Sequence, residues 1–152
     1  TFFLQTVFNF PVFILKKELL QIPVFGWHLK KIGSISINRD KISKDNYGFY
    51  DKIINITNNT KRPVIIFPQA TRTSPDEKIP FKKGVSKIYE KLNFICVPVA
   101  LNSGDVWPKN GSLKPNKTIR VSIINSIPSG LKTEDFRNKI QENLYNELDK
   151  IR

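Results

Sequence analysis

The chain of 152 residues contains no methionine and only one cysteine. A single cysteine, Cys96, cannot form a disulfide within the chain, which excludes disulfide-stabilised secreted folds and favours a reducing compartment. The chain opens on the apolar run Thr1-Phe2-Phe3-Leu4 without a starting methionine. We therefore expect further residues before Thr1 in the intact protein.

Long hydrophobic runs are also absent. The most apolar stretch, residues 1–15, is interrupted by Gln5, Asn9 and Pro11 and ends at Lys16. A membrane-spanning helix needs roughly 20 apolar residues, so we expect no transmembrane helix here. No basic and then apolar segment with a small-residue cleavage site is present, so we expect no signal peptide.

Acidic residues are scarce relative to basic ones. The chain has 25 Lys and Arg against 13 Asp and Glu, which gives a net charge of +12. The expected partners are therefore anionic: phosphate-bearing metabolites, acidic lipid surfaces, an acidic carrier protein or nucleic acid. A hydrophobic content of 39% with 11 Phe is enough for a core. We expect a single globular domain over residues 1–152.

Short β-rich runs alternate with longer segments that suit helices. The expected strands are Val12–Leu15, Ser34–Ile37, Val64–Phe67, Ile95–Leu101 and Ile119–Ile124. The expected helices are Pro23–Lys31, Lys41–Asn58 and Gly84–Leu92, followed by a closing amphipathic helix for which Thr133 is the N-cap. This order predicts an α/β fold with a central, mostly parallel or mixed sheet flanked by helices. The strands at Val64 and Ile95 are nearly all apolar, so we expect helices to cover both of their faces.

Polar residues directly follow two of these strands. Gln69, Thr71 and Arg72 come after the strand at Val64, and Arg39 comes after the strand at Ser34. Ligands in open α/β sheets bind at the ends of strands, and a guanidinium matches phosphate oxygens, so both arginines are candidates to hold one phosphate dianion. The alternative is a surface turn with a solvated Arg72 and an Arg39 paired with a nearby Asp.

A third basic element, Lys82-Lys83-Gly84, comes directly before the predicted helix Gly84–Leu92. Backbone N–H groups and the helix dipole at such a position favour an anion. Solvated lysines without a ligand are the alternative.

Four segments in this order resemble the 1-acyl-glycerol-3-phosphate acyltransferases, within the glycerol-phosphate acyltransferase family. Lys16 to Trp27 is similar to the family's Lys-x-Glu-Leu and Pro-x-x-Gly-Trp region, and Gly33 to Arg39 to its second block. Phe67 to Arg72 resembles the Phe-Pro-Glu-Gly-Thr-Arg block, and Val97-Pro98-Val99 the Val-Pro-Val block. The resemblance covers nearly the whole chain and implies the fold of these enzymes.

Two departures from the family pattern stand out. Gln69-Ala70 replaces Glu-Gly, so a carboxylate becomes an amide, and Ala70 would be strained wherever the backbone needs a positive φ. The family's His-x4-Asp/Glu motif is not found in the chain, because His28 has Ile32 four positions later. We therefore assign no catalytic residue here, interpret His28 as structural, and expect the motif before Thr1.

The resemblance implies a reaction for the intact protein. The motif His acts as general base on the free hydroxyl of lysophosphatidic acid, which attacks the thioester of acyl-CoA or acyl carrier protein to give phosphatidic acid. Within this chain the implied substrate-binding residues are Arg39, Gln69, Thr71, Arg72, Lys82, Lys83 and Gly84. No metal or other cofactor is implied, and the expected location is the cytoplasmic face of a membrane.

Alternatives remain at this stage. A catalytically empty, lipid-phosphate-binding relative would keep the same fold. A nucleic-acid-binding module fits the charge, but the lysines are scattered and no zinc-ligand set, helix-turn-helix or RNA-binding sheet motif occurs. Trp27 and Phe25, with Lys30 and Lys31, are either an interfacial anchor or part of the core. Cys96, in an apolar run, is interpreted as a core residue rather than a nucleophile.

Overall fold

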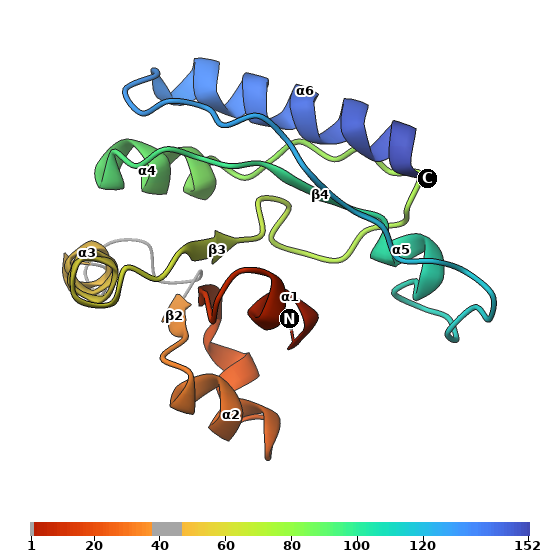
Figure 1. Cartoon of the computed structure of the whole chain (residues 1–152), viewed down its shortest axis with the longest axis horizontal. Helices are drawn as coiled ribbons and strands as arrows, with labels where there is room; N and C mark the ends of the chain where they lie inside the picture. The colour runs from red at the N-terminus through yellow and green to blue at the C-terminus, as the bar shows by residue number, and fades with distance from the viewer. Residues whose placement is uncertain (1, 38–46) are drawn as a thin grey trace. The chain divides into compact units, whose positions relative to one another are not determined.

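A computed structural model describes residues 2–37 and 47–152 of the chain (Figure 1). The elements follow in the order α1 (Phe2–Val7), β1 (Val12–Lys16), the 3-10 helix η1 (Lys17–Gln21), α2 (Phe25–Lys31), β2 (Ile35–Ile37), α3 (Tyr47–Thr60), β3 (Val64–Ile66), α4 (Lys83–Leu92), β4 (Val99–Leu101), α5 (Ser103–Val106), β5 (Val121–Ile123) and α6 (Thr133–Ile151). The contacts divide the chain into two compact units, residues 1–67 and 68–152. The single domain expected from the sequence stays a prediction.

The first unit is built on a three-stranded parallel sheet in the order β2-β1-β3. The central strand β1 is buried over Val12, Phe13, Ile14 and Leu15, because neighbouring strands and helices surround it. Phe13 and Leu15 pack with Leu4 and Leu29 in one cluster, with partly buried side chains of η1, α2 and β3 around it. This cluster fixes α2 against the sheet.

Arg62 links the segment before β1 to the end of α2, a role that the sequence did not indicate. Its guanidinium donates to the carbonyls of Phe10 at 2.5 Å, Pro11 at 3.3 Å and Ile32 at 2.7 Å. Three carbonyls from the start of β1 and the end of α2 thereby gain a charged donor, which makes stronger hydrogen bonds than a neutral one.

The second unit packs α4 against α6, which run side by side in Figure 1, together with the antiparallel pair β4 and β5. Tyr89 of α4 and Phe136 of α6 stack with ring centroids 3.7 Å apart. The buried faces of the two helices supply Val85, Ile88 and Ile140 to this core. The helical spacing seen in the sequence therefore corresponds to a real buried stripe.

The α/β class and the parallel sheet are confirmed, and three local expectations are wrong. β4 begins at Val99 rather than Ile95, and Ile95 and Val97 are exposed instead of covered on both faces. The cause is that this segment pairs only as an isolated antiparallel bridge between Cys96 and Ile127, which leaves alternate side chains facing outward. The N-cap of α6 is Lys132 rather than Thr133, which is the first residue of the helix and whose hydroxyl donates to Glu90 at 3.0 Å.

Over the described residues, no helix has both the length and the apolar character needed to cross a membrane.

Candidate functional site

The segments predicted to bind phosphate begin where two strands of the first unit end. β2 and β3 lie on either side of β1 and run parallel to it, with Lys16 opposite Ile37 and Ile14 opposite Ile66. The chain therefore leaves both strands at the same edge of the sheet. Arg39 lies outside the described residues.

A hydrogen bond brings the other two predicted segments together within the second unit. The amide N–H of Lys82 donates to the carbonyl of Pro68 at 3.2 Å, which closes the loop between β3 and α4. Gln69, Thr71 and Arg72 follow one end of this bond, and Lys83 and Gly84 follow the other. Arg72 and Lys82, which are 10 residues apart in the sequence, thus lie in one closed loop, and Lys83 and Gly84 begin the helix that follows it.

Three cationic side chains in or next to this loop are unengaged, whereas Lys78 of the loop pairs with Asp149 at 2.6 Å. Arg72, Lys82 and Lys83 are exposed and form no ion pair with any residue that the structure describes. α4 begins at Lys83, one residue before the predicted start, and its N-cap Lys82 makes no side-chain capping bond. The first-turn N–H groups of α4 therefore have no side-chain acceptor from the N-cap, and an anion would complement them.

α6 fixes the loop from the other side. The Tyr145 hydroxyl donates to the carbonyl of Ile79 at 2.6 Å and accepts from the Gln69 amide at 3.3 Å. The amide N–H of Phe81 donates to Gln141 at 2.8 Å, and the Phe81 and Tyr145 rings lie 5.4 Å apart. Neither Tyr145 nor Gln141 was among the residues predicted from the sequence, and together they position the loop rather than contact a ligand.

Within the part of the chain that the structure describes, the Gln69 and Thr71 side chains each have a hydrogen-bond partner, unlike the side chains of Arg72, Lys82 and Lys83. The Gln69 amide nitrogen points to Tyr145, while its amide oxygen has no partner among the described residues and can still accept from a hydroxyl. The Thr71 hydroxyl has a long contact of 3.5 Å with the Arg72 carbonyl and is exposed. The Thr71 side chain can therefore turn to a ligand at little cost, and Gln69 can offer its amide oxygen while its nitrogen stays bonded to Tyr145.

Ala70 adopts φ 61°, in the left-handed region that favours glycine. The sequence departs from the family's glycine at this position, and the strain foreseen for Ala70 is present. The backbone keeps the turn that a glycine would make more easily, so the loop geometry survives the substitution at an energetic cost.

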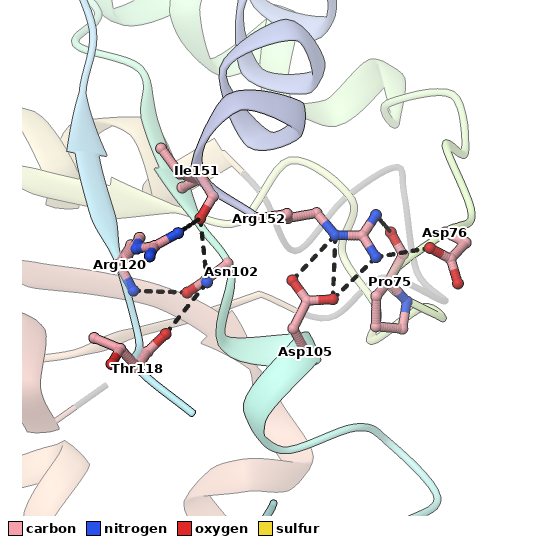
Figure 2. Close-up of polar contacts among 8 residues, drawn as sticks. All are labelled: Pro75, Asp76, Asn102, Asp105, Thr118, Arg120, Ile151 and Arg152. Atoms are coloured by element: carbon pink, nitrogen blue, oxygen red, sulfur yellow. Dashed lines mark hydrogen bonds and ion pairs between the residues drawn. The ribbon is translucent and has the colours of Figure 1, made fainter. Parts of the chain in front are cut away.

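The end of β4 is fixed by Asn102. Asn102 is buried, accepts from the Arg120 amide at 2.6 Å and donates to the Thr118 and Ile151 carbonyls (Figure 2). The Arg120 guanidinium donates to the same Ile151 carbonyl at 3.0 Å. These bonds cap the C-terminal end of α6, so Asn102 is a structural residue.

Next to Asn102, Arg152 joins three segments of the second unit. Its guanidinium contacts Asp105 at 3.0 Å, Asp76 at 2.7 Å and the Pro75 carbonyl at 3.1 Å (Figure 2). The two carboxylates raise the pKa of Arg152, chiefly through hydrogen bonds. An open, polar cavity of about 430 Å³ lies beside this cluster, between Asn102 and the 114–120 loop. The ion pairs tie the loop after Arg72 to the end of α6.

Cys96 and His28 behave as structural residues. Burial raises the pKa of the Cys96 thiol to about 11, so the thiol stays protonated at neutral pH and is a poor nucleophile. Cys96 is half-buried and exchanges two backbone hydrogen bonds with Ile127. The His28 Nε2 lies 3.4 Å from the Gln5 amide nitrogen, inside the first unit.

Gly26 explains the glycine of the Pro-x-x-Gly-Trp block in steric terms. A Cβ at this position would lie 2.2 Å from the Leu20 carbonyl oxygen, much closer than any real contact. Only glycine lets α2 approach η1 this closely.

Comparison with known proteins agrees with these motifs. The sequence profile of the Acyltransferase family matches residues 1–102. The chain belongs to the acyltransferase family. This acyltransferase chain is 33% identical over 125 residues to the 1-acyl-sn-glycerol-3-phosphate acyltransferase of Pseudomonas aeruginosa, covering 81% of the chain and 48% of that protein. It is 30% identical over 138 residues to the protein of the same name from Helicobacter pylori, covering 88% of the chain and 56% of that protein.

A solved structure shares the fold of the acyltransferase chain. The crystal structure of the 1-acyl-sn-glycerophosphate (LPA) acyltransferase PlsC from Thermotoga maritima matches with a TM-score of 0.73 at 20% identity, over 93% of this chain and 57% of that one. The chain spans about half the length of the curated relatives it matches. The resemblance to the 1-acyl-glycerol-3-phosphate acyltransferases, and the fold that it implied, are confirmed.

Proposed function

We propose that the intact protein transfers an acyl group to the free hydroxyl of lysophosphatidic acid and produces phosphatidic acid. The observation that carries the proposal is the closed loop between Pro68 and Lys82, in a chain of the acyltransferase family. Relatives named 1-acyl-sn-glycerol-3-phosphate acyltransferase from two bacteria support the choice of acceptor.

In this proposal the loop holds the acceptor's phosphate. Arg72 provides a planar pair of donors for two phosphate oxygens, and Lys82 and Lys83 add charge beside the start of α4. Thr71 and the Gln69 amide oxygen lie next to Arg72 in the sequence and can hydrogen-bond the glycerol hydroxyls. Arg39, after β2, would add a second guanidinium. Holding the phosphate fixes the hydroxyl at the catalytic base, and such positioning lowers the barrier substantially.

In this proposal, the general base and its acidic partner come from residues before Thr1. A His-x4-Asp/Glu motif before Thr1 would provide the general base, because free imidazole titrates near neutral pH. The hydroxyl loses its proton to that base as its oxygen attacks the thioester carbonyl, and the base returns the proton to the sulfur as the thiol of coenzyme A or acyl carrier protein leaves. The proposed location is the cytoplasmic face of a membrane, where a lysophospholipid is available.

The decisive experiment supplies the purified intact protein with labelled acyl-CoA or acylated carrier protein and with one of two acceptors. We expect labelled phosphatidic acid from lysophosphatidic acid, and far slower transfer to the matching monoacylglycerol, which lacks the phosphate. Equal rates with the two acceptors would refute phosphate recognition. Transfer by the 152-residue chain alone would refute the position proposed for the base.

A further inference from the structure

Three apolar side chains of one short segment in the first unit face solvent. Ile22 is 45% exposed, Val24 80% and Trp27 65%, between the end of η1 and the middle of α2. We call these three residues the Trp27 surface. Scattered exposed apolar residues are ordinary, but three within six positions form a continuous feature of the chain.

Val24 occupies a strained backbone conformation. Its φ of 61° and ψ of −55° place it at the centre of a γ-turn, closed by the Phe25 amide N–H and the Pro23 carbonyl at 2.6 Å. A β-branched residue is among the least suited to positive φ. A strained position that holds an exposed aliphatic side chain points to a role outside folding.

The surroundings of the Trp27 surface are firmly packed. Gly26 lies against the Leu20 carbonyl, Leu29 is fully buried, and Phe25 packs on the core cluster of the first unit. Of the two aromatic residues whose role was open, Phe25 therefore belongs to the core and Trp27 does not. The surface is held rigidly outward, so its binding would require little ordering.

Basic residues accompany the apolar ones. Four lysines and one glutamate lie between Lys16 and Lys31, and the four lysines are exposed. The ammonium of Lys31 lies 5.0 Å from the centre of the Trp27 ring. Tryptophan with adjacent lysine suits the headgroup region, where the ring meets the acyl boundary and the ammonium meets anionic lipid.

We infer that the Trp27 surface docks the protein onto an anionic lipid bilayer, with Val24 and Trp27 inserted at the headgroup boundary and Lys30 and Lys31 on lipid phosphates. The inference deepens the proposed function and rests on it only for the choice of a lipid partner. Charge complementarity selects the bilayer over a second copy of this chain, since the chain has a net charge of +12 and would repel itself.

Trp27 itself reports on insertion. In a Trp107→Phe variant, Trp27 is the one tryptophan left in this chain, which has two. The intact protein in this background is mixed with vesicles of phosphatidylcholine and phosphatidylglycerol whose acyl chains are brominated. We expect a blue shift and quenching of the Trp27 emission, and both should weaken as salt screens the lysines. The variant with both Trp27→Phe and Trp107→Phe gives the background emission. If the emission that remains after this background is subtracted does not change on adding vesicles, the inference is overturned.

A second variant separates docking from folding and from catalysis. Val24→Gly removes the aliphatic side chain and relieves the positive φ, so its folding should not suffer. Vesicle partitioning should weaken roughly tenfold, the loss expected for about 1.4 kcal/mol of apolar burial. Leu113→Gly, at another exposed aliphatic site, in the second unit, should leave partitioning unchanged.

The remaining outcomes are also decisive. Loss of partitioning in Leu113→Gly but not in Val24→Gly would place the lipid contact elsewhere and refute the inference. A concentration-dependent dimer that Val24→Gly abolishes would identify a second copy as the partner and refute it too. Because these readouts need no acyl transfer, they stand even if the proposed reaction proves wrong.

Discussion

The amide of Lys82 donates a hydrogen bond to the carbonyl of Pro68 across a loop of the second unit. The bond joins Pro68, two residues after β3, to the N-cap of α4, so the polar cluster that ends at Arg72 and the basic start of α4 share one anchor point. Two features that look independent in the sequence thereby become parts of a single candidate phosphate site. Tyr145 and Gln141 of α6 then hold that loop in place.

Removing the Tyr145 hydroxyl should loosen the loop. Tyr145→Phe leaves the Ile79 carbonyl and the Gln69 amide without this partner, which should cost about 1–2 kcal/mol of unfolding free energy. The acceptor KM should rise as well, because Gln69 and Arg72 belong to the released loop. Denaturant unfolding and steady-state kinetics measure the two effects.

Tyr89 provides the matched control for this change. It is also buried, and its hydroxyl bonds the Pro128 carbonyl and the Leu131 amide, on segments outside the candidate site. Tyr89→Phe should therefore lower stability by a similar amount and leave the acceptor KM unchanged. An equal rise of KM in both variants would show that the loop has no special dependence on Tyr145.

Ala70→Gly should stabilise the protein. Ala70 has φ 61°, and relieving this conformation should gain up to about 1 kcal/mol after the greater chain entropy of glycine is subtracted. Gly130→Ala is the reverse test, because Gly130 has φ 89° with open space where a Cβ would lie. The midpoints of thermal unfolding should move in opposite directions, and a fall for Ala70→Gly would contradict the strain.

Gly26→Ala should destabilise the first unit strongly. The added Cβ would lie 2.2 Å from the Leu20 carbonyl, and backbone atoms cannot yield as a flexible side chain would. We expect a loss of roughly 1–3 kcal/mol or more, typical of overpacking. Gly48→Ala in α3, where a Cβ meets nothing within 4 Å, should be neutral or slightly stabilising. Similar losses in both variants would disprove the steric account.

Cys96 should react slowly with thiol reagents near neutral pH. Its pKa of about 11, raised by burial, keeps the thiolate fraction small until the pH approaches that value. Alkylation rates of the native protein should rise steeply toward pH 11, whereas the unfolded protein should already react near pH 9. Because the folded pKa is the higher one, this group's contribution to stability is complete below pH 9 and is lost as the pH rises to 11. Fast native alkylation at pH 8 would contradict the burial.

The sequence predicts some parts of this architecture well. The run at Val12 is short and continuously apolar, and the closing segment from Phe136 to Ile151 has helical spacing. Both became elements with buried residues at nearly the expected bounds. The apolar run at Ile95 wrongly predicted a strand with both faces covered. Over the described residues, its only pairing before β4 is the bridge from Cys96 to Ile127, a residue far along the chain, and Ile95 and Val97 stay exposed. Local apolarity alone cannot show which neighbour covers a strand.

The supports of the site could not be predicted from local sequence. Tyr145 and Gln141 lie on a helix whose periodicity indicates only packing, and their bonds reach residues 60 or more positions earlier. Arg62 likewise follows a helix in a polar stretch, where a solvated side chain is the usual outcome. Only the fold shows that three carbonyls converge on it.

The central claim is that Arg72 holds the acceptor's phosphate, and the acceptor KM of Arg72→Ala in the intact protein tests it most directly. Losing a bidentate charge-assisted contact should raise that KM about tenfold or more while kcat changes little. Arg137→Ala, which removes the ion pair that the half-buried Arg137 forms with the exposed Glu134 on α6, is the control and should leave the KM unchanged. An acceptor KM for Arg72→Ala equal to that of the unmodified protein would contradict the phosphate site.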